Sequence, residues 1–152
     1  MVLNLQQNMI KFIPVEETLL MRNEILREGK LSLDECRFPS DLLPGAFHLG
    51  YYQHRELACI ASFHPQTYGD FGGAGFQLRG MATTEKYRGK GIGNQLLNFA
   101  IVYLKGQKAN YLWCNARETA LRFYQNVGFE VISDRFVIPV TGPHYVLYVK
   151  IQ

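Results

Sequence analysis

The sequence lacks the features that mark membrane-spanning, secreted and metal-binding proteins. None of its apolar runs reaches about 18 residues, the length that a membrane-spanning helix needs. Residues 1–12 carry no basic region followed by an apolar stretch, so no signal peptide is predicted. Its 3 cysteines form no Cys-x-x-Cys pair and no Cys/His cluster. These observations predict a cytoplasmic protein with reduced thiols, no membrane contact and no metal.

An excess of charge is also missing. The 16 basic and 13 acidic residues leave a net charge of +3, too little to predict a nucleic-acid partner. Tyr87 is the only aromatic residue within the basic run 86–90, so a stacking surface for bases is not predicted either. With 152 residues, 47% of them hydrophobic, and no internal repeat, the chain is expected to form a single domain over 1–152.

Apolar periodicity and turn residues predict an alternation of strands and helices. Strands are predicted at 9–13, 46–52, 57–63, 76–82, 111–114, 129–132 and 144–151. Helices are predicted at 15–28, 92–105 and 116–127. This order predicts a mixed α/β sheet with helices packed on it, and the unit from 76 to 114 should be a right-handed parallel crossover.

Three local signals set the expected boundaries of these elements. The polar residues 53–56 predict the turn of a hairpin between the second and third strands. Asn115 is predicted to cap the third helix, with Glu118 completing a capping box. Gly128 stands where a left-handed residue would end that helix.

A glycine-rich loop between a strand and a helix is the strongest functional signal. Glycines in the run Arg88-Gly89-Lys90-Gly91-Ile92-Gly93 let the backbone approach a ligand closely. The first amides of the following helix have no partner within the helix and point outward at the positive end of its dipole. Arg88 and Lys90 add positive charge, so the loop is predicted to bind phosphate or pyrophosphate.

Two familiar phosphate-binding motifs do not match this loop. A Walker A motif needs Ser or Thr after Gly-Lys, but Gly91 follows Lys90. The dinucleotide fingerprint needs a third glycine where Asn94 or Leu96 stands. What matches is the pattern Gln/Arg-x-x-Gly-x-Gly/Ala, met by Arg88, Gly91 and Gly93.

With this loop, the chain resembles the GNAT superfamily of acyl-CoA-dependent N-acyltransferases. The segment Leu78-Arg79-Gly80-Met81-Ala82-Thr83 is similar to the strand that precedes the loop in that family. Leu112-Trp113-Cys114-Asn115 is similar to its next strand, and Phe123-Tyr124 with Gly128-Phe129 matches its Phe-Tyr-x-x-x-Gly-Phe signature. The close resemblance covers about residues 76–130.

The resemblance implies a fold and a co-substrate. The expected fold is a mostly antiparallel, strongly twisted sheet of about six or seven strands, with a splayed parallel pair at its centre and helices on both faces. Acetyl-CoA would hold its pyrophosphate on the amides of Arg88, Gly89, Lys90, Gly91, Ile92 and Gly93. Its pantetheine arm would pair with the main chain of Met81, Ala82 and Thr83, opposite Asn115. Phe123 would pack in the core or line the groove.

The implied reaction is direct transfer of the acetyl group to a primary amine of a small molecule or peptide. Tyr124 is the candidate acid for the leaving thiolate, and His144 the candidate base for the amine. Other groups that could act as the base are Asp34, Glu35, Asp41, His48 and His64. An acyl-enzyme on Cys114 is not expected, since the thiol has no adjacent base.

The identity of the acceptor remains open in the sequence. The acidic groups Asp34, Glu35 and Asp41 would suit a cationic amine, whereas Arg79 would suit an amine with a carboxylate. The alternative function is a non-catalytic acyl-CoA sensor or scaffold, which has no need of an acid such as Tyr124. A homodimer is expected if the apolar last strand is an exposed edge.

Overall fold

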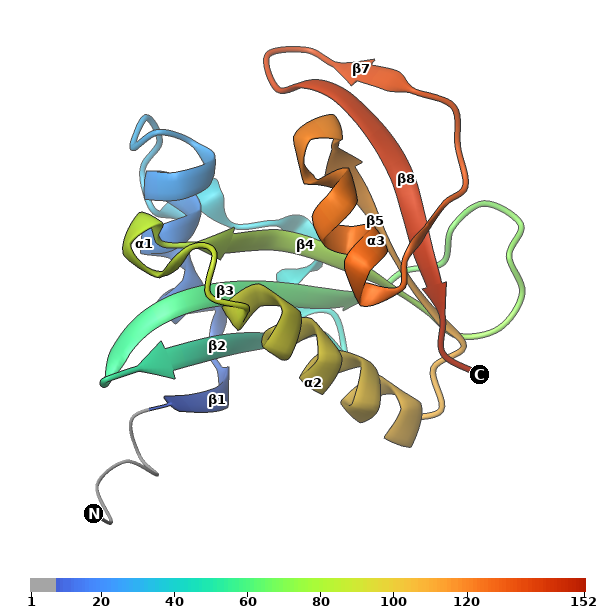
Figure 1. The fold of residues 1–152 in the computed structure, drawn as a ribbon, viewed down its shortest axis with the longest axis horizontal. Coiled ribbons are helices and arrows are strands. Elements are labelled where there is room, and N and C mark those ends of the chain that lie inside the picture. Colours follow the sequence, from blue (N-terminus) through green and yellow to red (C-terminus); the bar gives the residue numbers. More distant parts are fainter. Residues whose placement is uncertain (1–7) are drawn as a thin grey trace. The chain divides into compact units, whose positions relative to one another are not determined.

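The computed structural model describes residues 8–152 and divides them into two compact units. The first unit holds residues 8–64 and Arg79–Leu96, and the second holds Pro65–Leu78 and Leu97–Gln152. Strand β4 and helix α2, labelled in Figure 1, contribute residues to both units. Residues 1–7, part of the segment in which no signal peptide is predicted, lie outside the described residues. None of the helices described is long and apolar enough to cross a membrane.

The strands form one hydrogen-bonded sheet in the order β1-β2-β3-β4-β5-β8-β6, and β7 also pairs with β8. These eight strands exceed the six or seven expected. The strands are β1 (Asn8–Ile13), β2 (Phe47–Gln53), β3 (Glu56–Pro65), β4 (Gly75–Thr83), β5 (Tyr111–Arg117), β6 (Glu130–Val131), β7 (Phe136–Ile138) and β8 (Gly142–Lys150). The sheet is mixed and mostly antiparallel, with β4 and β5 as its parallel pair, which confirms the predicted class of fold.

In the first unit, β1, β2 and β3 form an antiparallel meander. The turn between β2 and β3 consists of His54 and Arg55, with φ angles of 51° and 66°. Two left-handed residues in a two-residue loop match the right-handed twist of the strands they join. The predicted hairpin is therefore confirmed, and its turn is built without glycine.

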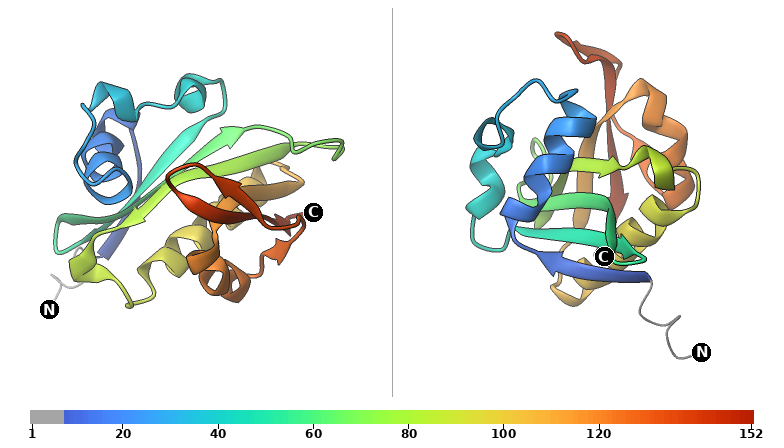
Figure 2. Two further views of the ribbon diagram at one scale, coloured as in Figure 1. Left: turned by 90° about the horizontal axis from the view of Figure 1, so that it is seen from above. Right: turned by 90° about the vertical axis from the view of Figure 1, so that its left-hand side faces the viewer.

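An irregular helical segment lies between β1 and β2, where one helix over 15–28 is predicted. It comprises a 3₁₀ turn η2 (Val15–Thr18), a short α1 (Leu19–Met21) and a π-helical turn η3 (Arg22–Leu26). Arg22 and Asn23 are buried within it, and the wider π turn accompanies this inward placement of polar side chains. The segment packs through Val15 and Leu19 on Cys36, in the loop that carries the 3₁₀ turns η4 (Asp34–Cys36) and η5 (Pro39–Leu42), as Figure 2 shows in blue and cyan.

In the second unit, β8 is paired along both sides. It pairs with β5 from Tyr111↔Lys150 to Arg117↔His144, and its other side is paired with β6 and β7. The β7–β8 hairpin is the red ribbon of Figure 2. The expectation that the last strand is an exposed edge is wrong, and the argument for a homodimer built on that edge no longer holds. Strand β7 is not among the predicted strands, because three residues are too few for a period-2 pattern.

The third helix begins later than its sequence predicts. Strand β5 continues to Arg117, a 3₁₀ turn η7 (Glu118–Ala120) follows, and α3 spans Leu121–Val127. Asn115 is not its N-cap, because this residue pairs with Val146 as part of β5. Gly128 does end the helix, with φ at 118° and its amide donating to the carbonyls of Tyr124 and Gln125.

An aromatic cluster surrounds Tyr111 in the second unit. The Tyr111 ring lies 5.4 Å from the ring of Phe71 and 6.5 Å from that of Tyr148, and its hydroxyl accepts the amide of Tyr68 at 2.9 Å. A Cβ on Gly75 would overlap this ring. Glycine is therefore required at position 75 for packing, since the buried Tyr111 ring is held by Phe71, Tyr148 and the Tyr68 amide.

We expect Gly75→Ala to lower the free energy of unfolding by about 1–3 kcal/mol, because overpacking forces a buried ring to shift. Gly72→Ala is the matched control, since a Cβ there meets nothing within 4 Å and φ is not left-handed. Denaturant unfolding of both variants measures the difference. Equal stabilities would contradict the packing argument.

Candidate active site

The predicted phosphate loop joins β4 to α2 (Ile92–Gly106) in the first unit. A 3₁₀ turn η6 (Glu85–Tyr87) comes first, and Gly89 and Gly91 then take φ angles of 74° and 78°. A Cβ on either glycine would meet nothing within 4 Å, so the backbone there is open to approach. The 15-residue helix α2 begins directly after Gly91, with its first amides at the loop.

Side chains tie this loop to the end of β4. Arg88 Nε donates to the carbonyl oxygen of Thr83 at 3.0 Å, while Lys90 Nζ lies 5.8 Å from the Tyr87 ring. One of the five N–H groups of Arg88 is therefore used to fix the loop to the strand. Arg88, Gly89, Lys90 and Gly91 are exposed, whereas Ile92 is buried and anchors the start of α2.

The end of β4 alternates between core and surface. Ala82 is buried and packs with Ile13, Met21 and Ile60, while Met81 and Thr83 on either side are half-buried. The Thr83 hydroxyl donates to Cys59 Sγ at 3.3 Å. Desolvation raises the pKa of the Cys59 thiol to about 11, so the thiol stays protonated at neutral pH.

A buried ion pair that sequence patterns do not reveal lies beneath this region of the first unit. Arg22 Nη1 donates to Asp41 Oδ2 at 2.8 Å and Arg22 Nη2 to Asp41 Oδ1 at 2.9 Å, with both side chains nearly inaccessible. Arg22 also donates to the Cys36 carbonyl and to Ser62 Oγ. The pair therefore links the helical segment, the 34–42 loop and β3.

The Asp41 carboxylate is saturated with donors. Besides Arg22, it accepts His64 Nε2–H at 2.9 Å and the amide of Phe38 at 2.7 Å. Burial alone would raise the pKa of Asp41, but the hydrogen bonds from Arg22, His64 and Phe38 and the charge of Arg22 outweigh it, so the pKa lies well below its usual range. Four donors fill the four lone-pair positions of the carboxylate.

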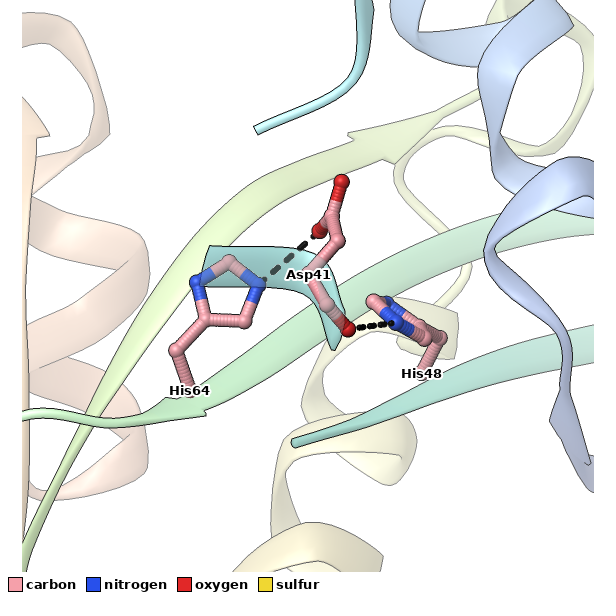
Figure 3. A group of neighbouring side chains, drawn as sticks. All are labelled: Asp41, His48 and His64. Carbon is pink, nitrogen blue, oxygen red and sulfur yellow. Dashed lines mark hydrogen bonds and ion pairs between the residues drawn. The ribbon is translucent and has the colours of Figure 1, made fainter. Parts of the chain in front are cut away.

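Two histidines flank this carboxylate, as Figure 3 shows. Since His64 Nε2 donates to Asp41, its Nδ1 accepts the hydroxyl of Ser40 at 2.8 Å in the neutral ring. Since Ser62 Oγ accepts from Arg22, it donates to His48 Nδ1 at 2.7 Å, which leaves His48 Nε2 to donate to the Asp41 carbonyl at 3.3 Å. Burial lowers the pKa of His48 and so favours this neutral form.

Asp41, His48 and His64 are of metal-ligating type and lie within 4.8 Å of one another. The lone pairs of all three are nevertheless occupied by Arg22, Ser40 and Ser62 and by their own contacts. The cluster is therefore a hydrogen-bond network that holds the 34–42 loop against β2 and β3. Asp41, His48 and His64 belong to this network and are not exposed bases.

Arg79 stands on β4 with its guanidinium Cζ 4.0 Å from the centroid of the Phe38 ring. Arg22 contacts the same ring at 4.1 Å. Gly80, the next residue, has φ at 63°, and a Cβ there would lie 3.0 Å from Phe38 and 3.2 Å from Arg22 Nε. The Phe38 ring thus occupies space that glycine leaves open beside the strand.

The second unit carries the predicted acid. Tyr124 on α3 is 9% exposed, with its ring centroid 5.0 Å from that of Phe123 and 5.4 Å from that of Phe129. Phe123 is half-buried, and Asn115 is an exposed residue of β5. Burial raises the pKa of Cys114 far above its usual range, which agrees with the expectation that this thiol is not a nucleophile.

His144, the predicted base, is a buried residue of β8 opposite Arg117. Its Nδ1 lies 2.8 Å from the carbonyl oxygen of Gly142, and the rings of His144 and Phe136 stack at 5.9 Å. A carbonyl only accepts, so Nδ1 carries the proton and Nε2 of the neutral ring keeps a lone pair. The tautomer therefore suits a proton acceptor at Nε2.

Sequence patterns missed Arg22, Phe38 and Thr84. The Nε of Arg22 and the hydroxyl of Thr84 are buried without a hydrogen-bond partner in the structure described. Arg22 stands between Met21 and Asn23 in a helical pattern, where a basic residue is usually read as exposed. Arg22 and Asp41 are 19 residues apart in the sequence and meet only in the folded chain, so no periodicity in the sequence marks the pair.

The family description "Acetyltransferase (GNAT) domain" matches residues 44–131, more than half of the chain. The chain belongs to the GNAT acetyltransferase family. It is an acyltransferase enzyme, as the resemblance implies. A curated relative, "Uncharacterized N-acetyltransferase YitI" of Bacillus subtilis (strain 168), is 37% identical over 140 residues, which cover 91% of this chain and 93% of the relative.

Solved structures share the fold of this GNAT domain at low sequence identity. A protein from Lactobacillus plantarum, described as an N-acetyltransferase, superimposes with a TM-score of 0.77 at 20% identity, covering 97% of this chain and 100% of the other. An aminoglycoside 6'-N-acetyltransferase complexed with coenzyme A has a TM-score of 0.68 at 16% identity, covering 95% and 97%. At these identities the likeness establishes the fold alone.

We expect Asp41→Asn to lower the free energy of unfolding by about 3–5 kcal/mol at pH 7, because Arg22 then remains buried without a counter-charge. Asp34→Asn is the matched control, since Asp34 is exposed and water screens its pair with Arg37. The folded-state pKa of Asp41 is depressed, so its contribution is present above about pH 4 and is lost as the pH falls below it. Urea unfolding at pH 7 and at pH 3 should show the gap between wild type and Asp41→Asn shrinking. A constant gap would contradict this assignment of the charge.

Proposed function

We propose that this acyltransferase moves an acetyl group from acetyl-CoA to a primary amine by direct attack, working as one domain. The observation that carries the proposal is the loop 88–93 at the start of α2, in which residues 88–91 are exposed. It offers left-handed glycines, free space at both Cβ positions and two basic side chains. A helix N-terminus of this kind suits a pyrophosphate. One solved structure of this fold, the aminoglycoside 6'-N-acetyltransferase, is a complex with coenzyme A, which supports the choice of donor.

In this proposal, the amides of Arg88, Gly89, Lys90, Gly91, Ile92 and Gly93 hold the pyrophosphate. The Nε of Arg88 is bonded to Thr83, so its two Nη groups remain to meet phosphate oxygens. Met81, Ala82 and Thr83 offer main-chain groups to the amides of the pantetheine arm, as an added strand would be bound. Asn115 and Phe123 are the proposed contacts in the second unit.

The thioester supplies an activated acyl carbon and a thiolate leaving group. The amine nitrogen forms a bond to that carbon, the carbon–sulfur bond breaks, and the thiolate receives a proton. We assign the delivery of this proton to the Tyr124 hydroxyl and the removal of the amine's proton to Nε2 of His144. A protonated thiol is a better leaving group than a thiolate, so the acid raises the rate at which the carbon–sulfur bond breaks.

The proposal includes a cytoplasmic location, supported by Cys36, Cys59 and Cys114, all of which are free and buried. The alternative from the sequence analysis, a sensor that binds acyl-CoA without turnover, would bind acetyl-CoA but release no free thiol. Incubation with acetyl-CoA and a panel of amines, read by a thiol reagent, distinguishes the two functions.

We expect Gly91→Asp to weaken the binding of acetyl-CoA strongly, because its carboxylate would stand against the pyrophosphate. Gly91→Asn is the matched control: Asn has the same size and also tolerates the φ of 78° at this position. Calorimetric titration should show the Asp variant binding roughly 100-fold more weakly than the Asn variant, the scale of a like-charge contact. Equal affinities would refute the assignment of the loop.

Tyr124→Phe tests the proposed acid. We expect turnover to fall by roughly 10²–10⁴-fold while the affinity for acetyl-CoA stays nearly unchanged. Tyr148→Phe removes a phenol hydroxyl elsewhere in the second unit and should leave turnover as in wild type. The steady-state rate of free-thiol release measures the turnover of wild type, Tyr124→Phe and Tyr148→Phe. Full activity in Tyr124→Phe would return Tyr124 to a packing role.

A further inference from the structure

Arg79 is a half-buried arginine whose positive charge has no counter-ion in the part of the chain that the structure describes. Its guanidinium lies against the Phe38 ring, and no acidic side chain pairs with it. The carboxylate whose charge acts on Arg79 is that of Asp41, but four hydrogen-bond donors already saturate it. The neighbourhood of Phe38 therefore holds two guanidinium groups, of Arg22 and Arg79, and one carboxylate.

The position of Arg79 is fixed by its surroundings. The Phe38 ring lies between the strand and the 34–42 loop, where Gly80 lacks a side chain and Arg22 contacts the same ring. The Phe38 amide is itself bonded to Asp41. A guanidinium that rests on a fixed aromatic ring loses less side-chain freedom on binding an anion than a free surface arginine does.

The order of residues along β4 places Arg79 at the reacting end of the bound donor. This step rests on the proposed function. If the loop Arg88–Gly93 holds the pyrophosphate and the arm runs back past Thr83 to Met81, the thioester lies toward the earlier residues of β4. Arg79 precedes Met81 by two residues, which is at most about 7 Å along a strand. The long side chain of Arg79 therefore reaches the region of an acceptor amine.

Acidic side chains that would attract a polycationic acceptor are engaged elsewhere. Asp34 pairs with Arg37 at 3.1 Å, Glu35 accepts the Ser32 amide at 2.8 Å, and Asp41 is held by Arg22. Of the four charged residues that the sequence offers for acceptor recognition, Arg79 is thus the one that is half-buried and has no ion-pair partner among residues 8–152.

We propose that the acceptor is an amine that also carries a carboxylate, as an amino acid or a short peptide does, and that Arg79 binds this carboxylate. The planar guanidinium matches a carboxylate with two parallel hydrogen bonds, and the negative charge of the acceptor supplies the missing counter-ion. Arg79 is a binding residue that sets specificity; it takes no part in proton transfer.

Matched pairs of acceptors test this proposal. Wild-type protein with acetyl-CoA is assayed for thiol release with L-amino acids and with the amines that lack only the carboxylate, such as phenylalanine and phenethylamine. The proposal expects kcat/KM to favour the carboxylate-bearing member of at least one pair by roughly tenfold or more. If wild type acetylates the amines without carboxylates as well as or better than their partners, the proposal is overturned.

Arg79→Gln then identifies the residue responsible. We expect the KM of the preferred amino acid to rise by roughly 10–100-fold, with kcat and the kinetics of the carboxylate-free amine unchanged. Arg79→Lys should recover part of the affinity, since Lys keeps the charge without the fork. Arg37→Gln, the same change at an exposed arginine, is the control and should leave both acceptors unaffected. An equal loss for both acceptors in Arg79→Gln would refute a carboxylate contact.

Calorimetry separates this proposal from the proposed function. Titration of each protein with acetyl-CoA shows whether the donor binds and whether Arg79→Gln is folded. Absence of donor binding in wild type contradicts the proposed function. A third outcome is that the donor binds, while no carboxylate-bearing amine is acetylated and none binds to the complex of the protein with coenzyme A. In that case the inference about Arg79 fails and the donor site stands.

Discussion

The buried pair of Arg22 and Asp41 is the constraint on which the first unit depends. It joins a helical segment, a loop and a strand that no local pattern would bring together, and it is nearly inaccessible to water. A charge in this position stabilises the fold only while its partner is present, because either ion alone would be costly to bury. The saturation of Asp41 by four donors shows how completely the structure meets that requirement.

The same pair determines which charges remain for chemistry. With Asp41 committed to Arg22, neither His48 nor His64 faces a free carboxylate, and both rings are held in defined tautomers by serine hydroxyls. Phe38 is fixed through its amide, and Arg79 rests on the Phe38 ring. The placement of these charged and aromatic groups therefore follows from the contact between Arg22 and Asp41. An engineered change in the pair would therefore disturb the placement of Phe38 and Arg79 as well as stability.

Features encoded within short segments could be predicted from the sequence. The hairpin of β2 and β3, the helix after Gly91 and the end of α3 at Gly128 follow from turn residues and periodicity. Predictions that depend on distant partners failed. Asn115 is a good cap by residue type, but pairing with β8 extends the strand past it. The last strand looked like an exposed edge because β7 is too short to show a pattern and the pairing of β6 with β8 is not visible in the sequence. The inward placement of Arg22 depends on Asp41, which lies in another element.

Cys59 has a consequence for an enzyme that handles a thioester. A thiolate exchanges readily with thioesters, so a reactive cysteine beside a bound acyl donor would capture the acyl group itself. Cys59 is fully buried and accepts a hydrogen bond from the Thr83 hydroxyl, and burial raises the pKa of its thiol to about 11, so it offers very little thiolate at neutral pH. The burial that completes the core beneath β4 thus also protects the protein from acylating itself.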